Sequence, residues 1–374
     1  MEIGLDVVAV IGFFVAVGLL LLYDRKNIEF NYGLIIRRWK RGQYVMDKWI
    51  FSHRKFLEIV GTIGIVVGLI AAVVGLAAII WLTTLNQQAV SPVLPTVGGF
   101  EYPAGVIGVP FWFWIVSIFV ILTVHEPMHA IFARLAGVPV RSWGVMTFFV
   151  LPLGAFVDPD MKKVSRLSLS QKLRIFAGGS FGNFVTGAVV AVVLFVMAST
   201  MFVQVFVQST IPNTPAAEAG VEGKLLSVNG IETRNVTELG MVLREVPAGS
   251  TVEVATESGT YQVVTAELPK GGEGSYLGLS FGTRMVVREA YSAWNDVIFT
   301  LYQLFYWLFI FNVGIGIFNM LPMKPFDGGH MFEAIFARFF GDKFARTAIH
   351  VTSFVVLGII LINVFGTNLI KALI

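Results

Sequence analysis

The sequence predicts a polytopic α-helical membrane protein with one small α+β domain inserted outside the membrane. The mean hydropathy is +0.76, and charged residues make up 14% of the 374 positions, against about 25% in ordinary soluble domains. Several apolar runs are long enough to cross a bilayer, which takes about 20 helical residues. A later stretch, 203–269, is instead rich in polar residues and turn signals.

Six apolar runs reach the length of a membrane span. They lie near 5–22, 58–82, 112–136, 176–203, 295–320 and 348–369. The first run has no basic segment before it and ends at Tyr23-Asp24-Arg25, so we expect a retained helix and not a cleaved signal. The runs divide the chain into a two-helix region with a basic loop, a first part of a membrane core, an inserted domain and a second part of the core: 1–110, 111–203, 204–290 and 291–374.

Lysine and arginine predict the orientation, because cytoplasmic loops carry an excess of both. The loop 24–55 has nine basic and three acidic residues, and the segment 134–174 has seven and two. The loop 84–110 has no lysine or arginine, and 204–293 has six basic and ten acidic residues. We therefore expect a multi-pass protein of the plasma membrane, with the first two segments in the cytoplasm and the inserted domain outside.

The inserted stretch reads as short strands, turns and one helix. Residues 202–207 alternate as a strand does, 236–246 fits an amphipathic helix, and 251–264 fits a hairpin. This order, with Thr214-Pro215-Ala216-Ala217-Glu218-Ala219-Gly220 followed by Ser227-Val228-Asn229-Gly230, resembles a PDZ domain. Such domains bind extended peptides by adding a strand to a sheet edge, so the resemblance implies a peptide or protein ligand. A generic small α+β domain is the alternative.

A second unusual stretch, 143–160, is apolar but too short to cross a membrane. Val145 to Leu151 would span only half a bilayer, and Pro152 and Gly154 follow. Bare strands cannot face lipid, so we expect a re-entrant hairpin that packs against the protein. An amphipathic surface loop is the alternative.

The third apolar run contains His125-Glu126-Pro127-Met128-His129. Helical residues four apart share a face, so the two imidazoles can bind one metal ion, with Glu126 beside them to activate water. Ionisable residues inside a membrane indicate function by default; helix-packing histidines are the alternative. His125 precedes Arg134 by nine residues, or about 13 Å along a helix, which places the site in the membrane near its cytoplasmic side.

A zinc site of this kind needs a third protein ligand, with the fourth position left for water. The chain has no cysteine, so only histidine and carboxylates remain. The fifth run ends in Phe318-Asn319-Met320-Leu321-Pro322-Met323-Lys324-Pro325-Phe326-Asp327-Gly328-Gly329-His330, where a helix is broken. Broken helices are tolerated in membranes where they line a cavity. The third and fifth runs both cross from outside to inside by the distribution of basic residues, so we expect Asp327 at the depth of the histidines. A turn aspartate at the membrane surface is the alternative.

These two motifs together, His-Glu-x-x-His and a later Asn-x-x-Pro-x-x-x-x-Asp-Gly, resemble those of the site-2 protease family of intramembrane zinc metalloproteases, in its PDZ-containing archaeal and bacterial branch. The resemblance covers about 110–340. It implies a Zn²⁺ ion held by His125, His129 and Asp327, with Glu126 as general base and Asn319 steadying the substrate carbonyl.

The segment Ala177 to Asn183 is similar to the family's Ala-Gly-Pro-x-x-Asn motif, which implies that Asn183 helps to shape the site. Three departures stand out. Gly179 stands where this motif usually has proline. Pro127 lies inside the metal-binding helix, where it removes a backbone donor, and Phe326 stands where leucine usually precedes the Asp-Gly pair.

The resulting expectation is an intramembrane zinc metalloendopeptidase that cuts the transmembrane segment of a single-span membrane protein in the lipid bilayer. Release of a signalling domain and clearance of signal-peptide remnants both remain open as its role. A metal transporter is the runner-up, but the sequence shows no repeated halves. An inactive scaffold is disfavoured because all four catalytic positions are intact. The net charge of +3 does not indicate nucleic acid, because the basic residues flank apolar runs.

Overall fold

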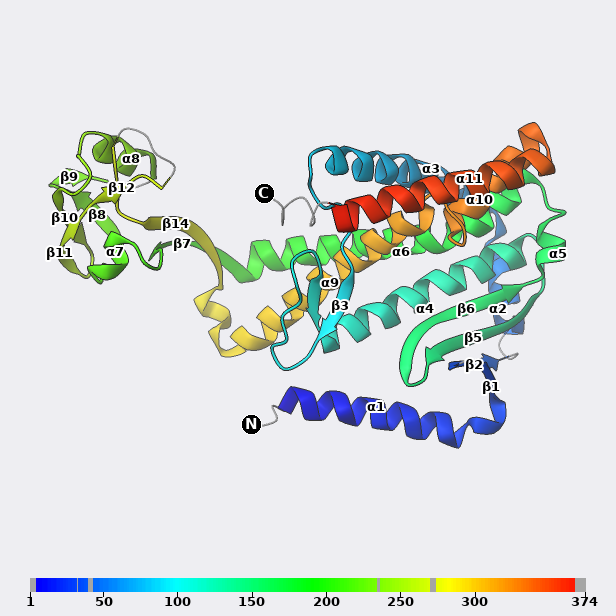
Figure 1. The fold of residues 1–374 in the computed structure, drawn as a ribbon. Coiled ribbons are helices and arrows are strands. Elements are labelled where there is room, and N and C mark those ends of the chain that lie inside the picture. The colour runs from blue at the N-terminus through cyan, green and yellow to red at the C-terminus, as the bar shows by residue number, and fades with distance from the viewer. Residues whose placement is uncertain (1–4, 32, 40–42, 234–235, 270–273, 367–374) are drawn as a thin grey trace. The chain divides into compact units, whose positions relative to one another are not determined.

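The computed structural model describes residues 1–374 except 1–4, 32, 40–42, 234–235, 270–273 and 367–374. The chain forms two compact units (Figure 1). A membrane unit contains residues 1–194 and 300–374, and an inserted unit contains residues 195–299.

Among the described residues, five helices are long and apolar enough to cross a membrane. They are α3 (Arg54–Thr84), α4 (Phe111–Leu135), α6 (Leu169–Met201), α9 (Asn295–Met320) and α11 (Asp342–Leu361). Five of the six predicted spans are therefore confirmed by length and composition, and the protein is a multi-pass membrane protein. The sixth, α1 (Leu5–Tyr23), is an apolar helix whose stretch Val7–Tyr23 falls short of that length.

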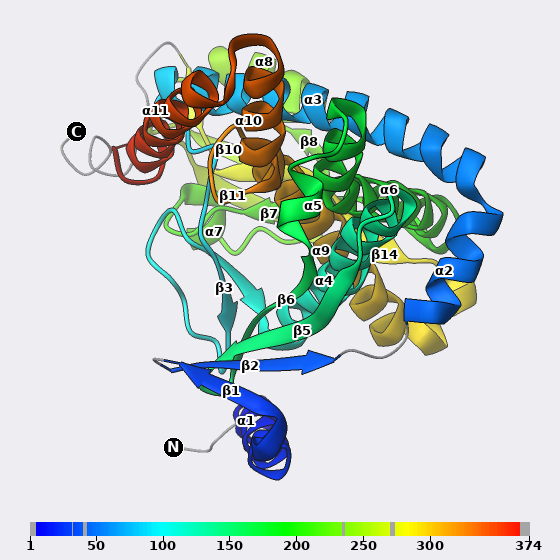
Figure 2. The same ribbon diagram turned by 90° about the vertical axis from the view of Figure 1, so that its right-hand side faces the viewer.

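A four-stranded antiparallel sheet lies beside these helices (Figure 2). Its order is β1 (Ile28–Asn31), β2 (Leu34–Trp39), β5 (Val140–Phe148) and β6 (Leu151–Pro159). The hairpin expected at 143–160 is thus present as β5 and β6. The strands β1 and β2 were not predicted, since this stretch was interpreted only as a basic cytoplasmic loop.

The strand β6 runs along α4. A Cβ on Gly154 would lie 4.0 Å from Leu122, and the amide nitrogen of Val157 lies 2.9 Å from the Glu126 carboxylate. Both partners belong to the middle of α4. This contact is what brings the sheet to the site.

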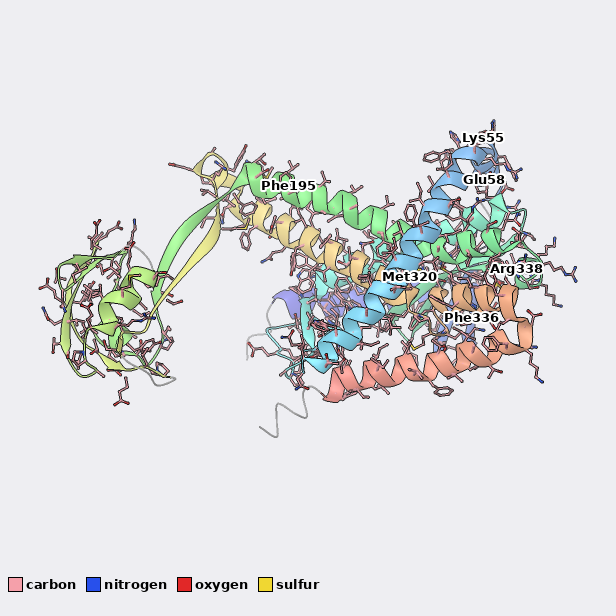
Figure 3. The ribbon with its side chains drawn as sticks, turned by 90° about the horizontal axis from the view of Figure 1, so that it is seen from above. Lys55, Glu58, Phe195, Met320, Phe336 and Arg338 are labelled. Carbon is pink, nitrogen blue, oxygen red and sulfur yellow. The ribbon has the colours of Figure 1, made fainter. Side chains whose placement is uncertain are left out.

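The helix α3 packs on the other membrane helices through a stripe of glycines. A Cβ on Gly61 would lie 2.6 Å from Phe132 of α4, and one on Gly64 would lie 3.1 Å from Phe181 of α6. A Cβ on Gly68 would lie 2.9 Å from the sulfur of Met320, which ends α9 (Figure 3). Small residues let helix backbones approach closely in membranes, so α3 is closely fitted to the helices around the site.

Polar contacts fix two further connections in the membrane unit. The side chain of Arg134 in α4 makes a bidentate pair with Asp47 of α2 (Gln43–Ser52), at 2.7 and 2.6 Å. Paired donors of this kind give geometric specificity as well as energy. Asn363, in the π-helical turn Ile362–Gly366, accepts hydrogen bonds from the amides of Ala89 and Val90 at 2.8 and 2.9 Å.

The remaining elements of the membrane unit are short. They are the turn η1 (Arg25–Asn27), the parallel pair β3 (Val93–Thr96) and β4 (Ile107–Pro110), and the helices α5 (Met161–Val164) and α10 (Asp327–Phe340). The helix α10 follows the break after α9, and its first residue is Asp327.

The inserted unit contains a four-stranded sheet in the order β11 (Gly259–Val264), β10 (Thr251–Thr256), β8 (Leu225–Val228) and β9 (Ile231–Glu232). The helix α8 (Val236–Arg244) packs Leu239 and Leu243 against the sheet's buried valines. The predicted helix at 236–246 and hairpin at 251–264 are confirmed. The turn β8–β9 carries positive φ angles at Asn229 and Gly230, 48° and 76°, which this hairpin type requires.

A two-stranded ribbon of β7 (Phe202–Thr210) and β14 (Leu279–Val287) runs antiparallel in the inserted unit, with Thr210 opposite Leu279. Short elements complete it: α7 (Pro215–Glu218), the pair β12 (Ala266–Glu267) and β13 (Ser275–Tyr276), and the turn η2 (Glu289–Trp294).

Candidate metal centre

The two histidines lie on one face of α4, as their spacing predicts. The helix runs through Pro127 without a break, and the Nε2 atoms of His125 and His129 lie 3.1 Å apart. His125 is buried. The unusual proline therefore leaves the pair together.

Asp327 joins the histidines from the start of α10. Its Oδ2 lies 3.2 Å from Nε2 of His125 and 3.3 Å from Nε2 of His129. The break between α9 and α10 makes this approach possible, because a Cβ on Gly328 would lie 2.1 Å from the Met320 carbonyl oxygen. Only glycine allows α10 to begin so close to the end of α9.

The three donor atoms fit a zinc ion. Bonds of about 2.0–2.1 Å in a tetrahedral zinc site place ligand atoms roughly 3.3 Å from one another. The observed separations are 3.1, 3.2 and 3.3 Å. Two imidazoles and one carboxylate are also the donor set of several catalytic zinc sites, in which the fourth position stays open.

The helix α6 contacts the Nδ1 atom of both imidazole rings. Nδ1 of His129 lies 2.7 Å from the carbonyl oxygen of Ile175, and Nδ1 of His125 lies 3.1 Å from the side-chain amide nitrogen of Asn183. Gly179 lies between these positions, and a Cβ there would be 2.4 Å from Nε2 of His129 and 2.6 Å from Nε2 of His125. The rings can occupy these positions only because residue 179 has no side chain.

Glu126 is held by the sheet. Its Oε2 accepts a hydrogen bond of 2.9 Å from the amide of Val157 in β6. The carboxylate is therefore fixed beside the metal ligands and is not itself among the three convergent donors.

These residues open onto a cavity of about 440 Å³. Glu126, Asn319 and the three metal ligands line it, together with Val157 of β6 and apolar side chains of α4 and α9. His330 lines the cavity too and stacks on Phe176 at 5.2 Å between ring centres. All five predicted site residues thus meet at one cavity.

Three contributors had no clear sequence signal. The Ile175 carbonyl and the Val157 amide are backbone groups, which any residue type supplies. Gly179 was noted only as a departure from the proline of the family motif, and its closeness to the two rings had no sequence signal.

Comparison with known proteins agrees with this site. The model of peptidase family M50 matches residues 113–363. The chain belongs to peptidase family M50. This is the site-2 protease family, so the resemblance drawn from the two motifs is confirmed.

Two relatives of this M50 protein are informative. An uncharacterized protein of Methanocaldococcus jannaschii is 24% identical over 339 residues, which is 88% of this chain and 85% of the relative. A protein of Clostridium perfringens, named as a candidate zinc metalloprotease, is 24% identical over 281 residues, which is 57% of this chain and 83% of the relative. The M50 protein is accordingly a membrane zinc metalloprotease, and the cluster of His125, His129 and Asp327 can hold the ion.

Proposed function

We propose that this M50 protease is an intramembrane endopeptidase that cuts the transmembrane segment of a single-span membrane protein. One observation carries the proposal. The convergent donors of His125, His129 and Asp327 lie at a cavity in the middle of membrane helices, beside a carboxylate that a neighbouring strand holds in place. A hydrolytic site at this level reaches peptide bonds that lie inside the bilayer.

In this proposal His125, His129 and Asp327 hold the metal. When bound, zinc supplies Lewis acidity and lowers the pKa of a water molecule to about 7. The Val157 amide holds Oε2 of Glu126, so Oε1 takes the proton of the attacking water and passes it to the leaving nitrogen. Asn319, on the cavity wall, steadies the carbonyl oxygen of the scissile bond as it gains charge.

A helical substrate must unwind before water can attack, because its peptide groups are engaged in hydrogen bonds along the helix. The strand β6 offers partners for the unwound segment. It ends the sheet order and pairs with β5 on one side, while on the other side it approaches α4 and the cavity. Addition of a strand to a sheet edge satisfies the backbone of an extended peptide.

The site is proposed to lie near the cytoplasmic side of the plasma membrane, with the inserted unit outside. The supporting observation is the distribution of basic residues between 24–55, 134–174 and 204–293. The inserted unit is proposed to act as a PDZ-like peptide-binding domain.

Replacement of Asp327 by alanine is expected to remove the bound zinc, because two ligands of one helix are left without the third. The measurement is zinc per chain in protein purified in detergent, and it needs no substrate. We expect about one zinc in the wild type, in line with one three-ligand site, and a clear loss in the variant.

The matched control is Asp342→Ala, which removes an exposed aspartate at the start of another helix, α11. It should bind zinc as the wild type does. A wild type that binds no zinc after zinc is added back, or an Asp327→Ala variant with full zinc content, contradicts the proposed site.

Removal of the inserted domain is expected to broaden cleavage if that domain rejects substrates whose outer domains are intact. Residues 211–278 can be replaced by an Asn-Gly turn, because Thr210 and Leu279 are paired neighbours in the β7–β14 ribbon. The measurement compares cleavage of a single-span reporter with and without a folded outer domain. Zinc content should equal that of the full chain. Unchanged selectivity, or loss of all cleavage at full zinc content, counts against a filter.

A further inference from the structure

Asn183 is a buried polar residue in a membrane-spanning helix. One of the two polar atoms of its side chain lacks a hydrogen-bond partner among the described residues. The side chain is fully buried on α6. Its amide nitrogen lies 3.1 Å from Nδ1 of His125, and its amide oxygen has no hydrogen-bond partner among the described residues. A buried amide oxygen is costly to leave without a donor, which makes this residue a candidate for a role at the site.

The orientation of the amide decides which nitrogen of His125 carries the ring proton. With the amide nitrogen toward the ring, Nδ1 must accept and the proton lies on Nε2. Nε2 is the atom that points to His129 and Asp327, and a protonated nitrogen cannot bind a metal. Rotation of the amide by a half-turn places the oxygen, an acceptor, against Nδ1. The proton then lies on Nδ1 and Nε2 presents its lone pair.

At the second histidine ligand, His129, a backbone carbonyl oxygen accepts the Nδ1 proton. Nδ1 of His129 lies 2.7 Å from the Ile175 carbonyl oxygen, which can only accept a hydrogen bond. His129 is thereby held with Nε2 available. Metal-binding histidines almost always donate their other ring N–H to an oxygen acceptor of this kind. His125 has the side chain of Asn183 at the equivalent atom.

We propose that Asn183 is a positioning residue whose amide oxygen accepts the Nδ1 proton of His125 and so fixes the ring form that binds the metal. The inference rests on the proposed function, in which His125 is a ligand. Two oxygens of α6 then fix which ring nitrogen carries the proton in each imidazole. They are the backbone oxygen of Ile175 and the side-chain oxygen of Asn183. The function of the buried amide is to orient a ligand.

The test is zinc affinity, measured by competition with a chelator in detergent-purified protein. Asn183→Leu keeps the branching and the number of heavy atoms of the side chain and removes the acceptor, and we expect zinc to bind about 10–100-fold more weakly. Asn183→Asp keeps an oxygen at the same place and is expected to bind zinc at least as tightly as the wild type. Loss in the first variant and rescue in the second distinguish an acceptor from a residue that only fills space.

Asn312→Leu is the matched control. Asn312 is also a fully buried asparagine in a membrane helix, α9, with an amide oxygen that lacks a partner among the described residues. Its amide nitrogen bonds the Leu308 carbonyl at 2.7 Å, and it is not among the residues that line the cavity. This variant is expected to keep the zinc affinity of the wild type. Where leucine at 183 prevents folding, Asn183→Ala takes its place.

Three outcomes overturn the proposal. Equal zinc affinity in Asn183→Leu and in the wild type shows that the acceptor at residue 183 is not needed for metal binding. Weak binding by Asn183→Asp shows that packing, and not the oxygen, matters. Absence of zinc from the wild type and from Asn312→Leu removes the proposed metal site itself, and with it the role of Asn183.

Discussion

Replacement of Glu126 by glutamine is expected to lower the rate of cleavage by about 10²–10⁴-fold, the usual contribution of a general acid–base, while zinc remains bound. Glutamine keeps a side-chain oxygen that can accept the hydrogen bond from Val157, which measures 2.9 Å in the native protein. The strand β6 should therefore stay in place. What is lost is the basic oxygen that takes a proton from water. The measurement is single-turnover cleavage of a single-span reporter in liposomes, with zinc content determined on the same sample.

The control for this variant is Glu58→Gln. Glu58, labelled in Figure 3, lies in α3 and pairs with Arg54 at 2.9 Å, so its loss should leave cleavage unchanged. A Glu126→Gln protein that cleaves at the rate of the wild type would rule out the proposed general base. A variant that loses zinc as well would show that Glu126 has a structural role in the metal site.

Replacement of Gly179 by alanine is expected to disrupt zinc binding by more than about 100-fold, beyond the range typical of residues that only support a ligand. The new methyl group would lie 2.4 and 2.6 Å from the two Nε2 atoms that face the metal. One of the rings, or the backbone of α6, must move. Helix propensity acts in the opposite direction, since alanine favours a helix by about 1 kcal/mol over glycine. Zinc affinity measured with a competing chelator tests this expectation.

Gly314→Ala provides the comparison. Gly314 is also in a membrane helix, α9, but a Cβ there meets no atom within 4 Å. It should bind zinc normally and be no less stable to heat than the wild type. If Gly179→Ala also binds zinc normally, the rings must be able to shift together without cost, and the close fit described above is not needed.

The histidine pair could be predicted from sequence because its geometry is local. Residues 125 and 129 share a helix face whatever the rest of the chain does. Asp327 is different, since nothing in its neighbourhood specifies that it meets α4. The direction of the spans predicted only its depth, and the resemblance between motifs implied its role as a ligand. The physical cause of its position lies in Gly328, which lets α10 start against the backbone of Met320.

The strands β1 and β2 were missed for a related reason. The segment Leu34-Ile35-Ile36-Arg37-Arg38-Trp39 does not alternate between apolar and polar residues, so it lacks the usual strand signal. Its pairing with β5 joins Leu34 to Phe148, a contact distant in sequence. The short α10 was missed because its first turn contains Gly328 and Gly329, which are poor helix formers, and its 14 residues are fewer than a span needs.

The order of the three metal donors along the chain has a consequence for biosynthesis. His125 and His129 are made before the inserted unit, and Asp327 is made after it. A ribosome-bound chain that has completed α6 and all of residues 195–299 still has an incomplete donor set. The hydrolytic centre therefore forms only when the last part of the membrane unit emerges and docks. Synthesis itself keeps this protease inactive until the inserted unit has been made.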